Sequence, residues 1–158
     1  MAAGLRHEDV QELYRQHGPA LLAYGTSLLG DFAAAEDVLH QIFLKLLTMK
    51  ALPEGPRLYL FKAVRNRCLN VMRGRQRLTS LDQEWLIKPA GMVEAGLEVE
   101  KAVADLPPEQ REVLVMRIWG EMTLAEIAAV LEIPPNTAAS RYRYALEKLR
   151  TLLKGIEI

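Results

Sequence analysis

The stretch that decides the fold runs from Thr123 to Leu149 and reads TLAEIAAVLEIPPNTAASRYRYALEKL. It opens on a capping box, in which a threonine and a glutamate three residues later satisfy the free N–H groups that begin a helix. Residues 132–134 (Glu-Ile-Pro) make a tight turn, and a longer helix then carries Arg141 and Arg143 on its outer side. A short helix, a three-residue turn and a longer basic helix are typical of a helix-turn-helix, whose second helix enters the major groove of DNA.

The rest of the chain is predicted to be helical as well, which gives an all-α protein of two small domains joined by a linker. Strand-like alternation and Asn-Gly or Asp-Gly hairpin turns are absent from the sequence. Pro107 and Pro108 mark the start of a helix, and Gly120 is expected to end it as a C-cap. Because the periodicity fades after residue 77 and returns near Leu97, we predict domains over 5–77 and 100–155 with a linker over 78–99.

The N-terminal domain is expected to contain helices over about 9–17, 20–29, 33–49 and 58–73. Gly18 and Pro19 should interrupt the first pair, since proline lacks the N–H that a helix interior needs. Projected at 100° per residue, the last helix places apolar side chains on one side, so the lone cysteine, Cys68, is predicted to lie in the core. The opposite side is basic, amide-rich and partly aromatic, which suits contacts to phosphates and bases.

The charge of the 158-residue chain is balanced overall, with 20 basic and 20 acidic residues, but it is unevenly distributed. Residues 55–81 contain no acid. They carry Arg57, Lys62, Arg65, Arg67, Arg73, Arg75 and Arg77. A basic island between acidic flanks can hold a phosphate backbone even in a neutral protein, although a solvated helix face is the alternative interpretation.

Several classes of protein are not expected. No apolar run approaches the ~20 residues that cross a bilayer, and the charged N-terminus does not resemble a signal peptide. A single cysteine cannot form an internal disulfide, which suits the cytoplasm. The three histidines lack metal-ligand spacing, and phosphate-loop and nucleophile motifs are absent, so we expect no metal, cofactor, small-molecule substrate or catalytic residue. A small helical enzyme is therefore a remote alternative.

The C-terminal half resembles region 4 of the sigma-70 family of transcription initiation factors, of the small extracytoplasmic-function (ECF) type. Residues 106–113 (Leu-Pro-Pro-Glu-Gln-Arg-Glu-Val) resemble the opening of that region. Residues 126–128 (Glu-Ile-Ala) and 140–141 (Ser-Arg) stand at the spacing that its helix-turn-helix requires.

The N-terminal half resembles region 2 of the same family. Residues 35–38 (Ala-Glu-Asp-Val) through 43–46 (Phe-Leu-Lys-Leu) resemble region 2.2, the helix that binds core RNA polymerase. Residues 56–61 (Pro-Arg-Leu-Tyr-Leu-Phe), followed by 65–66 (Arg-Asn), resemble the start of region 2.4. The resemblance thus covers nearly the whole chain, with the two regions in the family's order.

The resemblance implies a sigma factor that binds core RNA polymerase and reads promoter DNA at the minus-ten and minus-35 elements. Polymerase contacts are expected from Asp37, His40, Gln41, Phe43 and Lys45. Minus-ten contacts are expected from Arg57, Tyr59, Lys62, Arg65, Asn66, Asn70 and Arg73. Minus-35 contacts are expected from Asn136, Thr137, Ser140, Arg141, Arg143 and Tyr144. An anti-sigma factor that wedges between the domains or covers them is a further expected partner, and direct membrane insertion is not expected.

The chain also departs from many members of the family. It has His40 and Gln41 where an amide and an acid are frequent. A stand-alone helix-turn-helix regulator is the alternative function. Such a regulator usually carries a sensor or dimerisation domain, and this chain has a basic, region-2-like helix in that place.

Overall fold

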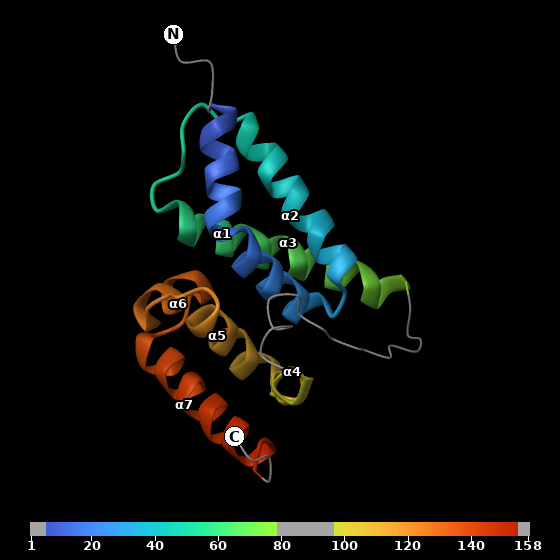
Figure 1. Cartoon of the computed structure of the whole chain (residues 1–158), viewed down its shortest axis with the longest axis vertical. Helices are drawn as coiled ribbons and strands as arrows, with labels where there is room; N and C mark the ends of the chain where they lie inside the picture. Colours follow the sequence, from blue (N-terminus) through green and yellow to red (C-terminus); the bar gives the residue numbers. More distant parts are fainter. Residues whose placement is uncertain (1–5, 79–96, 155–158) are drawn as a thin grey trace.

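The computed structural model describes residues 6–78 and 97–154, so most of the predicted linker, residues 79–96, lies outside the described part. The described residues form seven α-helices and no strand, which confirms the all-α prediction. Helices α1 to α3 make one bundle, and α4 to α7 make a second bundle below α3 in Figure 1. The bounds are α1 His7–Leu29, α2 Phe32–Leu47, α3 Pro56–Leu78, α4 Leu97–Ala104, α5 Pro108–Ile118, α6 Leu124–Leu131 and α7 Pro135–Leu152. None of these described helices is both long and apolar enough to span a membrane.

Helix α1 runs without interruption through Gly18 and Pro19, where the sequence predicted a break. Pro19 is exposed, so its ring points to solvent. Both halves of the helix bury side chains in the same core, from Val10 in the first half to Leu29 in the second. Proline removes one backbone hydrogen bond from the helix. The shared packing compensates for this loss, because most helix stability in proteins comes from tertiary contacts.

Helix α3 packs against α1 and α2 and is longer than the predicted 58–73. Its apolar side is buried as the projection predicted: Leu60, Phe61, Val64 and Cys68 are each no more than 1% exposed. Burial raises the pKa of the Cys68 thiol to about 12, so the thiol stays protonated at neutral pH. Cys68 is therefore a core residue, as predicted.

The helix-turn-helix begins with the predicted capping box. The Thr123 hydroxyl accepts a hydrogen bond from the Glu126 N–H at 3.1 Å, and the Glu126 carboxylate accepts one from the Thr123 N–H at 2.9 Å. The turn after α6 places Glu132 in the left-handed conformation, with φ 57°. Non-glycine residues rarely adopt this conformation. Glu132 adopts it because the chain must reverse direction here to connect α6 to α7.

Helix α7 packs on α5 and α6 through small side chains. Ala138 and Ala145 are fully buried, and they stand seven residues apart on one face. The buried face is narrow, and Leu146 is 37% exposed. It follows Ala145 by one residue and therefore lies about 100° further round the helix, at the edge of the narrow buried face.

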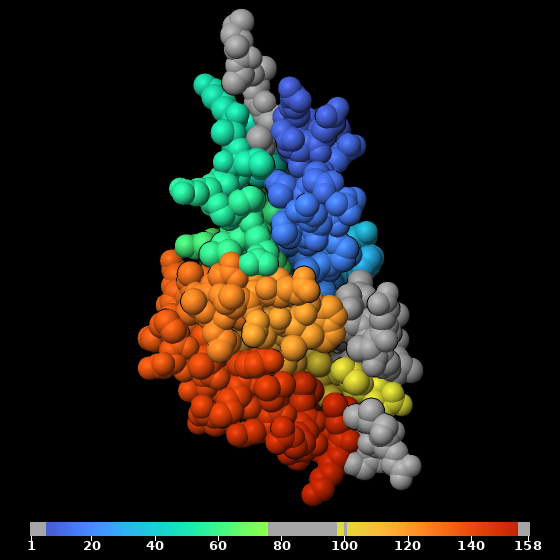
Figure 2. Space-filling model, turned by 60° about the vertical axis from the view of Figure 1, so that its left-hand side comes forward, coloured from blue at the N-terminus to red at the C-terminus, as the bar shows by residue number. Residues whose placement is uncertain are grey.

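The two bundles pack directly against each other. Helix α5 contacts α1 and α6 contacts α3, and in Figure 2 the orange surface of the second bundle meets the blue and green surface of the first. Gly120 lies at this contact, and its φ is not positive; Glu121 takes the left-handed conformation instead, with φ 53°. A Cβ on Gly120 would lie 2.5 Å from the Met116 carbonyl oxygen and 2.9 Å from Phe61 Cζ. The predicted C-cap role is thus wrong, since Trp119 is the C-cap, and glycine is needed because a Cβ would clash with the α5 backbone at Met116 and with the Phe61 ring of α3.

Replacing Gly120 with alanine should destabilise the protein. The added methyl would press on the Met116 carbonyl and on Phe61 of the other bundle, so we expect Gly120→Ala to lower the free energy of unfolding by about 1–3 kcal/mol. Urea denaturation followed by circular dichroism measures this change.

Gly74→Ala is the matched control, because a Cβ at Gly74 meets nothing within 4 Å on helix α3. It should raise the free energy of unfolding by about 0.5–1 kcal/mol, since alanine favours the helix. Equal stability of the two variants would contradict a tight contact at Gly120.

Candidate nucleic-acid interface

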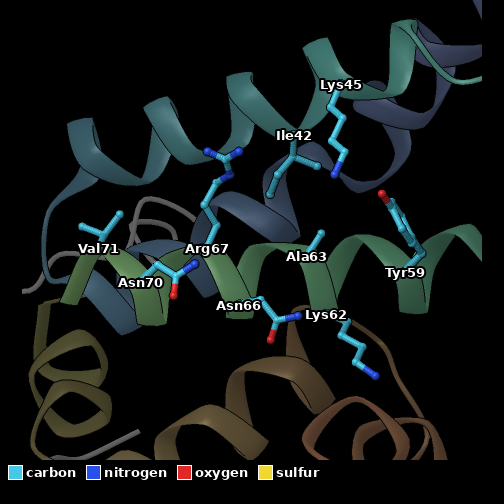
Figure 3. A pocket seen from close by; sticks show the side chains of 9 residues that line it. All are labelled: Ile42, Lys45, Tyr59, Lys62, Ala63, Asn66, Arg67, Asn70 and Val71. Carbon is cyan, nitrogen blue, oxygen red and sulfur yellow. The ribbon is translucent and has the colours of Figure 1, made fainter. Parts of the chain in front are cut away.

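An open groove of about 610 Å³ lies between α2 and α3. It is lined by Ile42, Lys45, Tyr59, Lys62, Ala63, Asn66, Arg67, Asn70 and Val71. In Figure 3, Lys45 extends from α2 toward α3, and Arg67 extends from α3 toward α2. An aromatic ring, carboxamides and cations along one groove suit a single-stranded nucleic acid, because bases stack on rings while cations neutralise phosphates.

The predicted minus-ten residues all lie on α3, but they divide between two sides of the helix. Tyr59, Lys62, Asn66 and Asn70 line the groove. Arg73 is exposed, and its guanidinium donates a hydrogen bond to the Asn70 side chain at 2.8 Å. Arg57 and Arg65 instead contact carboxylates of the second bundle. The sequence predicted one open basic face on this helix. In the structure, one part of that face lines an open groove, and the other part contacts the second bundle.

Arg57 forms an ion pair across the two bundles through its Nη2 nitrogen. Its guanidinium donates to both carboxylate oxygens of Glu126, at 2.8 Å each, and to the Glu121 carbonyl at 3.4 Å. The Thr123 backbone N–H and then Arg57 lower the pKa of Glu126, so this carboxylate is ionised at neutral pH. Glu126 therefore caps the first helix of the helix-turn-helix and also ties that helix to α3.

Lys62 stands at the boundary between the two sides of α3. It lines the groove, yet in Figure 3 its side chain points away from α2 and toward the second bundle. Its ammonium lies 3.3 Å from the Glu132 carboxylate, and both side chains are largely exposed. An ion pair as exposed as this one adds little to the free energy of unfolding. Lys62 can therefore leave Glu132 and bind another anion with little loss of stability.

Glu112 of α5 is only 8% exposed and lies where α1, α3 and α5 meet. Arg65 Nε donates to its Oε1 at 2.7 Å, and the Tyr24 hydroxyl donates to the same oxygen. Burial, together with the Glu112 charge, raises the pKa of Tyr24, so the phenol keeps its proton. Burial also lowers the pKa of Arg65, but the Glu112 carboxylate outweighs this effect and the pKa is raised. No local sequence pattern indicates this network, because its members come from three helices.

The predicted polymerase-binding residues lie on two sides of α2. His40 and Phe43 line an apolar groove of about 350 Å³ between α1 and α2. The Tyr14 ring meets Phe43 edge-on, with 5.0 Å between centroids, and Leu44 is 63% exposed beside them. Asp37 is exposed earlier on the same helix. An apolar groove bordered by polar side chains is typical of a protein-binding surface.

Gln41 and Lys45 lie on the other side of α2, toward α3. Gln41 accepts a hydrogen bond from Arg67, and Lys45 lines the larger groove. Arg67 was not among the predicted site residues. Its place in the acid-free stretch, four residues after Ala63 on the groove-lining face, could have indicated it.

The predicted minus-35 residues lie on α7: Asn136, Thr137, Ser140, Arg141, Arg143 and Tyr144. The Arg143 guanidinium lies over the exposed Tyr144 ring, 5.0 Å from its centroid. Tyr142 is instead half-buried against the core, with Arg117 5.9 Å above its ring. Helix α7 lies on the side of the second bundle away from α1–α3 in Figure 1, so its outer face can approach a DNA groove.

Comparison with known proteins gives matches in both halves. The Sigma-70 region 2 family matches residues 13–78, and the Sigma-70, region 4 family matches residues 96–149. The ECF RNA polymerase sigma factor SigL of Mycobacterium tuberculosis is 28% identical over 171 residues, which cover 99% of this chain and 96% of SigL. The ECF RNA polymerase sigma factor RpoE of Cereibacter sphaeroides is 26% identical over 123 residues, which cover 73% of this chain and 68% of RpoE.

A solved structure shares the fold. It is the sigma factor RpoE in complex with the anti-sigma factor NepR from Bartonella quintana, with a TM-score of 0.69 and 22% identity. The match covers 95% of this chain and 99% of that one. It includes both helical bundles.

The region 2 match spans most of α1 and all of α2 and α3, where a stand-alone regulator would carry a sensor or dimerisation domain. The region 4 match spans the helix-turn-helix. The alternative of a stand-alone regulator is therefore not favoured. The chain belongs to the sigma-70 family, as an ECF-type RNA polymerase sigma factor that directs transcription initiation.

Proposed function

We propose that this sigma factor divides its work among three surfaces of the described helices. The groove between α2 and α3 takes the single-stranded minus-ten element. The outer face of α7 reads the minus-35 element as a duplex, and the apolar groove between α1 and α2 binds core polymerase. The observation that carries the proposal is the composition of the α2–α3 groove, where a tyrosine, two asparagines and cations face one open space.

The minus-ten strand would be held by two kinds of contact. Tyr59 offers a ring on which an unpaired base can stack, and Asn66 and Asn70 offer amides that can bond base edges. Lys45 and Arg67 offer charges for the phosphates. Gln41 is neutral, so its hydrogen bond orients Arg67 and leaves the positive charge available for DNA.

The minus-35 duplex would be read from the first half of α7. Ser140 and Arg141 stand two turns or less from the helix start, where a second helix of this motif contacts base edges. Arg143 over Tyr144 forms a cationic, planar surface that suits a phosphate beside the groove. Asn136 and Thr137 complete the proposed contact set at the helix start.

The polymerase surface would centre on Phe43 and Leu44 of α2, with His40 and Asp37 at its polar edge. Leu44 is the most exposed large apolar side chain among the described residues. Exposed apolar side chains beside a groove favour burial against a protein partner. Gln41 and Lys45 of the expected set lie toward the DNA groove, and we propose that they serve DNA binding rather than polymerase binding.

We further propose that the protein has no catalytic activity, works in the cytoplasm and is held inactive by an anti-sigma factor. The two bundles already contact each other, which favours a partner that covers the grooves over one that wedges between the bundles. The proposed division assigns the polymerase and minus-ten surfaces to residues 5–77 and the minus-35 surface to residues 100–155, with 78–99 as the connection.

Run-off transcription tests the proposed function. With bacterial core RNA polymerase and a promoter library, the full-length protein should give transcripts from discrete start sites that core polymerase alone does not give. Binding of library DNA in the absence of any association with core polymerase would contradict the proposal and favour a stand-alone regulator.

A substitution in the groove tests the minus-ten assignment. Tyr59→Ala should reduce promoter opening by about fivefold or more, since stacking of one base on an aromatic ring contributes about 1–3 kcal/mol. Permanganate footprinting of unpaired thymines measures the opening directly. Tyr59→Phe keeps the ring and should open promoters nearly as well as the unmodified protein. If the alanine and phenylalanine variants open promoters equally, Tyr59 does not stack on the strand.

A further inference from the structure

We propose that the Asn70 end of the groove between α2 and α3 selects keto bases, guanine and thymine, over amino bases, adenine and cytosine. This end consists of Arg67, Asn70 and Val71, and Tyr59 lies at the other end in Figure 3. The inference rests on the proposed binding of single-stranded DNA in the groove, and it adds the chemical class of base that this end takes.

The groove is rich in hydrogen-bond donors. The described residues that line it include three cations, Lys45, Lys62 and Arg67, and no aspartate or glutamate. Lysine and arginine side chains donate hydrogen bonds and cannot accept them. Among the side chains of the Asn70 end, the amide oxygen of Asn70 is therefore the one acceptor that a base could use.

An arginine already occupies that oxygen. The Arg73 guanidinium donates a hydrogen bond to Asn70 Oδ1 at 2.8 Å. The same arrangement recurs nearby, where Arg67 donates to Gln41 Oε1. Because a guanidinium has no acceptor, the oxygen of each amide, and not its nitrogen, must face the arginine. Each amide thus presents its N–H donors to other partners.

The occupied oxygen removes the usual way in which an asparagine reads adenine. In that pair the amide oxygen accepts from the adenine N6 amino group while the amide nitrogen donates to N7. At Asn70 the oxygen already accepts from Arg73. An adenine amino group that approached its second lone pair would face the N–H groups of a cation, so the pair is disfavoured.

Keto bases match the donors that remain. Guanine presents two neighbouring acceptors, O6 and N7, and thymine presents O4. Adenine and cytosine carry an amino group in place of that keto oxygen. Their amino protons would meet the N–H groups of Arg67 or Asn70 and leave donors on both sides unpaired, which is unfavourable once water is displaced.

Two matched pairs of fluorescent single strands test this selection, with the full-length protein bound to bacterial core RNA polymerase and core polymerase alone as the background. In the first pair, 5-methylcytosine replaces every thymine. The methyl group and the ring size stay the same, and the keto oxygen becomes an amino group. In the second pair, hypoxanthine replaces every adenine and makes the opposite change. Phosphate contacts are the same within each pair.

The dissociation constants should favour thymine over 5-methylcytosine, and hypoxanthine over adenine, by at least about threefold each. The reason is that the amino base leaves donors of the groove without an acceptor. Tyr59→Ala should weaken the binding of both members of a pair alike, since stacking on the ring is tolerant of base identity.

Asn70→Asp tests where the selection resides. A carboxylate only accepts hydrogen bonds, so the preference for keto bases should disappear or reverse. The added negative charge lowers the affinity for every strand, but it cancels in the ratio within a pair. The control is Gln16→Glu, which adds the same charge at an exposed position of α1 outside the groove and should keep the preference. An unchanged preference in Asn70→Asp would overturn the proposal.

Arg73 acts here as a positioning residue, and two variants test that role. Arg73→Met removes the hydrogen bond that engages the Asn70 oxygen, so the amide can pair with adenine again. The preference for hypoxanthine over adenine should fall by about twofold or more. Arg73→Lys keeps a donor at this position and should retain the preference. Equal preferences in the two variants would overturn the positioning role of Arg73.

The outcomes separate this inference from the proposed function. Equal affinities within both pairs of strands, together with weaker binding by Tyr59→Ala, would overturn the base selection and leave the groove as the binding site. Strand binding that Tyr59→Ala does not weaken, or a failure of every strand to bind above the background, would overturn both.

Discussion

The Glu112 carboxylate, held between Tyr24 of α1 and Arg65 of α3, is the contact on which the arrangement of the two regions depends. A nearly buried charge is costly unless hydrogen bonds satisfy it, and here both donors come from the other region. The energetic requirement of one side chain on α5 therefore fixes where region 4 lies. Gly120 and the Arg57–Glu126 pair fit the same placement, since each depends on α3 being close.

This placement gives α3 three different sides. Its apolar side, from Leu60 to Cys68, is the core of region 2. Its second side forms the groove with α2, and its third side meets the carboxylates of region 4. One basic helix thus combines a structural side, an open side suited to single-stranded DNA and a side whose charges are already paired. Within the cluster of seven cations, Arg57, Lys62 and Arg65 are thus paired with carboxylates of region 4, while Arg67 lines the open groove.

Features that depend on local sequence could be predicted, and features that depend on contacts between distant residues could not. The capping box at Thr123 and the buried side of α3 follow from spacing along one helix. Helix α1 continues through Pro19 because both of its halves pack in the same core. The residues next to proline do not reveal this packing, so the sequence predicted a break. The partners of Glu112 come from helices 47 and 88 residues away in the chain, so no motif could bring them together. Arg67 is different, because its place in the acid-free stretch could have indicated it, and only its hydrogen bond to Gln41 on another helix depends on the fold.

The structure of the complex with core polymerase and an opened promoter tests the central claim most directly. The account predicts that single-stranded DNA lies in the groove between α2 and α3, and that α7 lies in the major groove of the upstream duplex. An opened promoter whose unpaired strand lies outside this groove would contradict it.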